Sequence, residues 1–567
     1  MSEDLPLTMP TETSRSLQTP MTSRKGILRA TVDVPAARAD SSARRGPSRW
    51  RTPEFYVYYV VFAAAVPWMV WVPLRLSSTE HANYHWFAPR LARSWLGLKF
   101  DNSDVQYRSF RSNIPALLAF ASAFFALKHL YLRLARPSPS LSKSNTHLLP
   151  FYLAFSLTML LALHGTSALK ILLILSGNYA ISTLGKGKRW VPGATWVYNM
   201  AVLFANERYG GYRYAALHSE LGFLDSFSGA YPRWHVTFNI TMLRLVSFNM
   251  DSYWAHRRTG LPDSGAALNP KQRTTTYHGL EAYSFANYLA YALYPPLYIA
   301  GPIMTFNDWF WQLQRPLPIS WPATLRYTLR FLLTLTLMET LIHTLYVVAI
   351  KDAHAWNADT PPELAMLGFW NLIVVWLKLL LPWRFFRAWA MGDGVDAPEN
   401  MVRCMADNYS ALGFWRAWHR SYNLWIVRYI YVPLGGGLRA YALVFTFVAL
   451  WHDLSMRLLA WGWLATLVLV PEVTARKIFP ATKYGSEPWY RPLSALGGVA
   501  NILLLMSANL VGFVLGVDGF AYLSTQIAST WEGWAFMGMA CAGLFVGVMV
   551  MFEYREEEAR QGIDRKC

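Results

Sequence analysis

The residues best suited to chemistry are two histidines, His452 and His419, with Asn423 close to the second. His452 follows directly after the apolar run Ala442–Trp451, and a second apolar stretch, Leu458–Val470, begins soon after it. An ionisable group at the depth of a lipid bilayer is costly, so it marks a functional site by default. Histidine is also the side chain best suited to proton transfer near neutral pH. The placement of His452 therefore predicts a general base inside a membrane.

The spacing of these residues allows them to share a site. His419 and Asn423 lie four positions apart, so a helix through them would present both side chains on one face. Pro433 and the glycines at 435–437 end that helix and allow a tight turn. Roughly a dozen residues later, or about 18 Å of helix, the chain reaches His452. His419 and His452 can therefore meet at mid-membrane depth.

Each of these polar groups also has a structural interpretation. A Trp-His pair at a helix end commonly anchors the helix at the membrane surface, and for His419 taken alone this is the favoured interpretation. A buried hydrogen bond is the alternative for His452, although apolar sequence on both sides favours function. Glu339 and His343 form another polar pair, which we interpret as structural, with a proton relay as the alternative.

The composition predicts that membrane helices position these groups. The chain has 567 residues, of which 54% are hydrophobic and only 15% charged, and its mean hydropathy is +0.19. Spanning a bilayer takes roughly 20 apolar residues in a helix. We predict an all-α polytopic membrane protein with about ten to twelve transmembrane helices, some of them re-entrant or broken. The segments long enough to span are 55–74, 114–132, 148–164, 168–184, 283–306, 325–350, 364–381, 493–515 and 534–552, and the shorter or more polar ones are 234–253, 441–451 and 458–470.

The charge of the chain is better explained by a membrane than by nucleic acid. The formal net charge is +18, but Lys and Arg are scattered at the ends of apolar segments instead of gathered on one soluble surface. Such positions suit snorkelling side chains and anionic headgroups, and we expect no nucleic-acid partner. Three cysteines are too few for a disulfide scaffold, and we predict no metal site.

Three regions follow from this pattern. Residues 1–52 are rich in Lys, Arg, Ser, Thr and Pro, which predicts a disordered basic tail on the cytosolic side of the membrane. Residues 53–553 form the membrane domain, with its core at 230–515. Residues 554–567 form a short charged tail. We expect no signal peptide, since the first apolar run begins near Phe55.

Four stretches together resemble a known family. They are the segment from Phe414 to Gly436, the segment from Phe447 to Asp453, the Tyr-rich segment 283–308 and Ala460-Trp-Gly-Trp-Leu464. They resemble the membrane-bound O-acyltransferase (MBOAT) family, and within it the fungal glycerol uptake protein (Gup) branch, which is related to hedgehog acyltransferase. The resemblance covers about 230–515 and implies an MBOAT-type helix bundle.

The resemblance also implies roles for individual residues. His452 falls on the catalytic histidine of the family, and His419 falls on its second catalytic position, where members carry His, Asn or Asp. Cys404 falls where hedgehog acyltransferase has a haem-ligating cysteine, so haem is an implied cofactor, with a free packed thiol as the alternative. The residues expected to line the substrate passage are Asn423, Trp415, Trp418, Arg428 and Tyr431.

The implied activity is transfer of a long or very-long-chain acyl group from acyl-CoA. The implied acceptor is the hydroxyl of a lyso-glycosylphosphatidylinositol (lyso-GPI) anchor or a lysophospholipid, in the endoplasmic reticulum membrane, with the plasma membrane as a second location. One alternative is a protein N- or O-palmitoyltransferase of the hedgehog-acyltransferase type, which His419 in place of that branch's Asp makes less favoured. Another is a glycerol transporter, although the sequence shows no internal repeat.

A further motif is rejected. His354-Ala-Trp-Asn-Ala-Asp359 satisfies the H-x4-D pattern of another class of glycerolipid acyltransferases. Two fixed letters match often by chance, and this segment stands in a Pro-rich loop. We therefore assign His354 and Asp359 no catalytic role.

Overall fold

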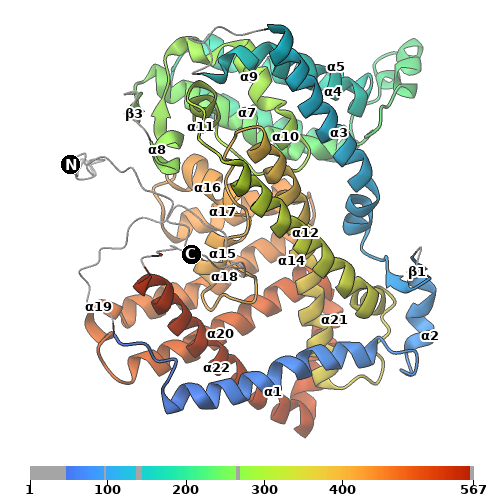
Figure 1. Ribbon diagram of the computed structural model, residues 1–567, viewed down its shortest axis with the longest axis vertical. Helices are drawn as coiled ribbons and strands as arrows, with labels where there is room; N and C mark the ends of the chain where they lie inside the picture. Colours follow the sequence, from blue (N-terminus) through green and yellow to red (C-terminus); the bar gives the residue numbers. More distant parts are fainter. Residues whose placement is uncertain (1–45, 95–96, 136–143, 264–267, 562, 564–567) are drawn as a thin grey trace.

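The fold is almost entirely helical, as predicted (Figure 1). A computed structural model describes residues 46–94, 97–135, 144–263, 268–561 and 563. Within these ranges the strands are limited to two short pairs. β1 (Leu91–Arg93) runs antiparallel to β2 (Lys99–Asp101), and β3 (Leu261–Pro262) runs parallel to β4 (Thr276–Tyr277). Most of the predicted tail at 1–52 lies outside the described residues.

Eight helices of the described ranges are long and apolar enough to cross a bilayer, which confirms a multi-pass membrane protein. A shorter apolar helix, α17 (Gly437–His452), carries His452 at its end. The eight are α1 (Pro53–Leu76), α3 (Val105–Ala135), α4 (Leu149–His164) with the turn η3 (Asn145–Leu148) before it, α5 (Ser167–Gly185), α14 (Pro361–Gly392), α18 (Met456–Ile478), α20 (Tyr490–Asn509) with its π-helical extension η8 (Leu510–Val514), and α22 (Trp531–Arg560).

Two of the predicted spans are broken in the structure. The segment 283–306 forms two short buried helices, α9 (Phe285–Ala292) and α10 (Pro295–Tyr298), because the Pro295–Pro296 pair lacks the backbone N–H groups that a continuous helix needs. The segment 325–350 divides into α12 (Trp321–Thr344) and α13 (Val347–Asp352).

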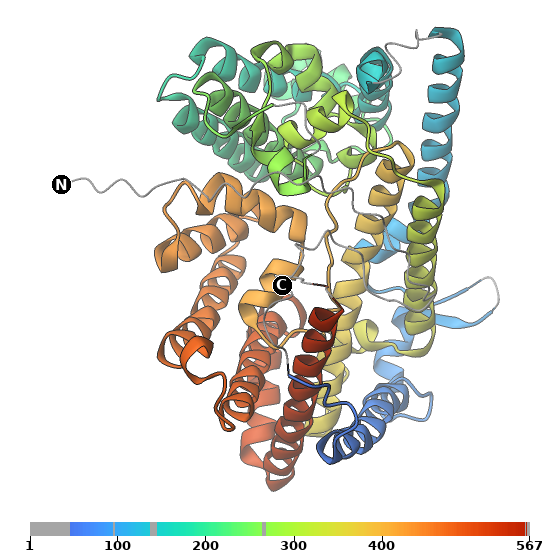
Figure 2. The same ribbon diagram turned by 60° about the vertical axis from the view of Figure 1, so that its left-hand side comes forward.

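The helices form two groups with a central set of helices between them (Figures 1 and 2). At one end of the molecule lie α4, α5, α7 (Trp234–His256), α9 and α11 (Phe306–Gln314); at the other lie α1, α20, α21 (Gly516–Ser529) and α22. Between them are α15 (Ala411–Ala417), α16 (Arg420–Ile426), α17 and α18, with α14 alongside. The remaining elements are α2 (Tyr84–Phe87), η1 (Ala88–Arg90), α6 (Val191–Tyr209), η4 (Tyr214–Ala216), η5 (Ser219–Ser226), α8 (Pro270–Thr275), η6 (Leu280–Tyr283), the π-helical η7 (Val427–Tyr431) and α19 (Ala481–Tyr484).

Candidate active site

His452 is held in place by the residue before it. The Trp451 indole donates to the Asn239 carbonyl on α7 at 2.8 Å, and the Asn239 amide donates back to the Trp451 carbonyl at 3.0 Å. This pair of hydrogen bonds fixes the end of α17 against α7. The His452 side chain remains accessible, and it lines a large cavity instead of packing into the core.

His419 occupies a strained turn between α15 and α16. Its φ is +44°, a left-handed conformation that is costly for residues other than glycine and is often found at functional sites. Neighbouring atoms hold this turn. The Asn400 carbonyl accepts from the Arg420 backbone N–H at 2.9 Å, and the Asn400 side chain accepts from the Ser421 backbone N–H at 3.0 Å. The Ser421 hydroxyl in turn accepts from the Ile303 backbone N–H at 2.9 Å.

A row of stacked rings connects the two histidines. The His419 ring stacks on Trp383, with centroids 4.4 Å apart, and lies 5.1 Å from the Tyr422 ring. Tyr422 stacks on Trp451 at 4.6 Å, and the Trp451 ring lies 4.8 Å from that of His452. All five side chains line the same cavity, whose volume is about 2480 Å³. The structure therefore brings His419 and His452 to one site.

The predicted passage residues separate into two groups. Asn423, Trp415, Trp418 and Tyr431 line the cavity. The Asn423 backbone N–H donates to the His419 carbonyl at 3.0 Å, so the two residues are one helical turn apart even though α16 begins only at Arg420.

Arg428 lies outside the cavity wall. Its guanidinium donates to the buried Asp251 carboxylate at 2.7 Å and lies over the Trp254 ring, 4.7 Å from its centroid. The contacts of Arg428 therefore indicate a structural role within the bundle.

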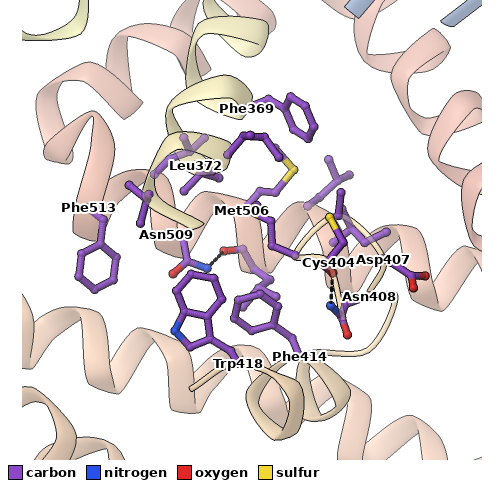
Figure 3. Close-up of a pocket in the computed structure, with 18 of the residues that line it drawn as sticks. Phe369, Leu372, Cys404, Asp407, Asn408, Phe414, Trp418, Met506, Asn509 and Phe513 are labelled. Carbon is purple, nitrogen blue, oxygen red and sulfur yellow. Dashed lines mark hydrogen bonds between the residues drawn. The ribbon is translucent and has the colours of Figure 1, made fainter. Parts of the chain in front are cut away.

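The surroundings of Cys404 do not suit haem. Its thiol lies at the cavity near Asp407, Asn408 and Met506 (Figure 3). Haem ligation through cysteine uses the thiolate. Desolvation by the surrounding wall and the Asp407 carboxylate both raise the pKa of Cys404, which disfavours the thiolate. Across the described ranges no group of three or more His, Cys, Asp or Glu side chains could hold a metal ion.

The structure adds Tyr422 to the site. Its ring is buried, and its hydroxyl has no hydrogen-bond partner among the described residues. An unpaired buried hydroxyl is costly and calls for an explanation. The sequence alone does not distinguish Tyr422 from the other aromatic residues around it, because the orientation of a hydroxyl depends on tertiary packing.

The two other polar pairs have structural partners. Glu339 accepts from Arg111 at 2.8 Å and from the Tyr107 hydroxyl at 2.5 Å. Neither Glu339 nor His343 lines the cavity. Asp359 of the rejected H-x4-D motif is buried and accepts from the Asn83 amide at 3.0 Å, whereas His354 is exposed.

Comparisons with known proteins identify the family of the chain. Residues 225–516 match the MBOAT, membrane-bound O-acyltransferase family, and the match includes both histidines. The chain is 43% identical to the membrane-bound O-acyltransferase GUP1 of Saccharomyces cerevisiae, over 94% of this chain and 96% of that protein. It is 41% identical to GUP1 of Candida tropicalis, over 92% and 90%. It is 24% identical to the protein-cysteine N-palmitoyltransferase HHAT of Mus musculus, over 46% and 56%.

These matches define the class of the protein. The chain belongs to the membrane-bound O-acyltransferase family, and it is an acyltransferase enzyme of a membrane. The family assignment implies an acyl donor and a lipid or protein acceptor in a bilayer.

Proposed function

We propose that this enzyme transfers a long or very-long-chain acyl group from acyl-CoA to the hydroxyl of a lyso-GPI anchor or another lysophospholipid. The observation that carries the proposal is the pair His419 and His452, which face one cavity with mostly apolar walls. The acyl thioester is already activated, so the reaction needs a base and oxyanion stabilisation but no metal.

The reaction can be written with these residues. The acceptor oxygen attacks the thioester carbonyl carbon while a ring nitrogen of His452 takes the hydroxyl proton. The resulting oxyanion accepts hydrogen bonds from the Tyr422 hydroxyl and a ring N–H of His419. The C–S bond then breaks, the new C–O ester bond remains, and the thiolate of CoA takes the proton from His452. The use of Tyr422 here gives its unpaired hydroxyl a partner.

The walls of the cavity support a long acyl chain. Beyond the histidines, the lining continues along α1, α14, α20 and α22 with side chains such as Val60, Phe369, Leu503 and Met539. Dispersion and the hydrophobic effect favour an alkyl chain on such surfaces. We assign Trp415, Trp418 and the other predicted passage residues of the wall to contacts with the acyl chain near the thioester.

The charge distribution supports a cytosolic donor. α7 runs from the His452 region, where Asn239 meets Trp451, to its far end at His256. The basic residues Lys186, Lys188 and Arg189 lie next to that far end of the bundle, where a Cβ at Gly187 would touch His256. Cytosolic loops carry an excess of Lys and Arg, which favours access of CoA from this end. We also propose that the enzyme resides in the endoplasmic reticulum membrane.

An acceptor panel tests the function. Purified enzyme in liposomes receives labelled long-chain acyl-CoA and one of three acceptors: lysophosphatidylinositol, a peptide with an N-terminal cysteine, or glycerol. We expect an ester product from lysophosphatidylinositol alone. Acylation of the peptide amine alone would favour the palmitoyltransferase alternative that the 24% identity to HHAT raises. Uptake of labelled glycerol without any acyl product would contradict enzyme function on these acceptors.

A further inference from the structure

A second, polar cleft includes the start of α18, the helix that follows His452 in the chain. Its volume is about 380 Å³. Segments far apart in the sequence form it: the end of η1, the end of α13 with the loop after it, the start of α18, and the junction between η8 and α21. The lining residues are Arg90, Lys351, Asp352, His354, Trp356, Arg457, Val514, Leu515 and Gly516.

The cleft is electropositive. Arg90, Lys351 and Arg457 oppose a single carboxylate, Asp352, so the lining carries a net charge of +2 when His354 is neutral. Lys351 pairs with Asp352, whereas Arg90 has no ion pair within the described ranges. Arg90 and Arg457 are exposed and therefore accessible to a ligand. Two arginines facing one cleft suit a planar or tetrahedral anion, because a guanidinium presents several N–H donors at once.

Arg457 is already oriented. Its Nη2 donates to the Gly512 carbonyl at 2.9 Å, at the π-helical end of α20. This contact uses one of the five N–H donors of the side chain and leaves the others available. Because the side chain is held before a ligand arrives, less conformational entropy is lost on binding.

The cleft is close to His452 along the chain and lies at the ends of two candidate membrane spans, α18 and α20 with η8. α17 ends at His452, and α18 begins at Met456, so Arg457 follows the histidine after a single short turn. Trp356, Val514 and Leu515 give the cleft an apolar side. A cleft with cations on one side and apolar side chains on the other, at the end of membrane helices, matches the boundary between lipid headgroups and acyl chains.

We propose that this cleft binds the phosphate group of the lipid acceptor. Arg90, Lys351 and Arg457 would hold the phosphate while the free hydroxyl of the lysolipid reaches His452. The inference rests on the proposed function and narrows it: the enzyme prefers acceptors that carry a phosphate over neutral acylglycerols.

The test compares two acceptors of the same chain length, lysophosphatidylinositol and monoacylglycerol. The variant is the triple R90Q/K351Q/R457Q, and the matched control is Arg93→Gln, an exposed arginine three positions beyond Arg90 that lines neither cavity. We expect the triple variant to raise the KM for lysophosphatidylinositol by about tenfold or more, since hydrogen bonds to charged groups are strong. The KM values for monoacylglycerol and acyl-CoA should be unchanged, as should all values for the control.

Binding without turnover separates this inference from the proposed function. A photoreactive lysophosphatidylinositol is crosslinked to the enzyme in detergent, with inorganic phosphate or monoacylglycerol as competitor. Labelling of wild type but not of the triple variant supports the cleft even if the acceptor panel yields no ester. Competition by inorganic phosphate would identify the phosphate alone as the recognised group, whereas its failure would assign recognition to the intact lipid headgroup. Equal labelling of both proteins, or equal loss of rate with both acceptors, would overturn the proposal.

Discussion

Two polar regions of this molecule differ in whether their groups already have partners. In the bundle around α7, the buried Asp251 carboxylate accepts from Arg428 at 2.7 Å and from the Tyr429 hydroxyl at 3.0 Å, so it has its partners within the protein. In the cavity, His452 faces open space and the Tyr422 hydroxyl has no described partner. Buried polar groups with partners hold a structure together, whereas those without them are available to a substrate.

The largest effect on activity that this comparison predicts, short of removing His452, is at His419. His419→Ala should lower kcat by about two to three orders of magnitude, the range for loss of one oxyanion donor. His419→Asn should retain more activity, because an amide N–H can still donate a hydrogen bond. Turnover of labelled acyl-CoA by purified protein checks both variants. Equal activity of the Ala and Asn variants would contradict a donor role for His419.

The largest effect on stability is expected at the buried ion pair. Asp251→Ala leaves the Arg428 guanidinium buried without its carboxylate, which costs about 3–5 kcal/mol. We expect a marked fall in the Tm in detergent and in the yield of folded protein. The double variant Asp251→Ala with Arg428→Met removes both charges and should recover part of the loss. No recovery would show that the pair matters through packing and not through charge.

Two tyrosines, one in each region, test the difference between the cavity and the bundle around α7. Tyr422→Phe should lower kcat by about tenfold or more while the Tm stays the same or rises, since the lost hydroxyl has no described partner. Tyr429→Phe is the matched control, because its hydroxyl bonds to Ser247 at 2.8 Å and to Asp251. It should cost about 1 kcal/mol of stability and leave kcat unchanged. Equal effects of the two variants on kcat and on Tm would contradict the difference between the cavity and the bundle around α7.

The smallest effect is a pH dependence at Asp359. Burial, with the nearby Glu363 carboxylate, raises the pKa of Asp359 to about 7, while the hydrogen bond from Asn83 opposes the shift. A raised carboxyl pKa means that the folded state favours the protonated form. Stability from this residue is therefore full below about pH 4 and is lost as the pH rises to 7.

Asp359→Asn should remove that loss, so the variant gains in Tm relative to wild type as the pH increases from 4 to 8. Asp518→Asn, at an exposed carboxylate in the first turn of α21, is the control and should follow wild type. Parallel Tm curves for Asp359→Asn and wild type would contradict the raised pKa.

The sequence predicted the helices whose surface faces lipid. Apolar runs of sufficient length identify α1, α3, α4 and α22, because the bilayer demands an apolar surface on such helices. Helices that are surrounded by protein are harder to recognise from apolar runs in the sequence. α6 places Thr195, Asn199 and Asn206 in the interior, and these polar residues explain why no span was predicted between 184 and 234.

The site was predicted from residue type and spacing, and its details depend on tertiary contacts. His452 stands out because a charged group in an apolar run is rare. Trp383 stacks on His419 from α14, more than thirty positions earlier in the chain, and no local pattern predicts that contact. For the same reason the pairing of Arg428 with Asp251 could not be inferred, and the residue was expected at the substrate passage.

The most direct test of His452 as the catalytic base is to replace it and to measure activity and stability together. Purified wild type and His452→Ala are compared at equal protein concentration for transfer from labelled acyl-CoA to lysophosphatidylinositol, and for Tm in the same detergent. We predict a loss of at least about two orders of magnitude in rate with an unchanged Tm, because the exposed His452 side chain faces the cavity instead of the core. A variant that keeps its activity, or one that loses activity only because it unfolds, would contradict the role of His452 as the catalytic base.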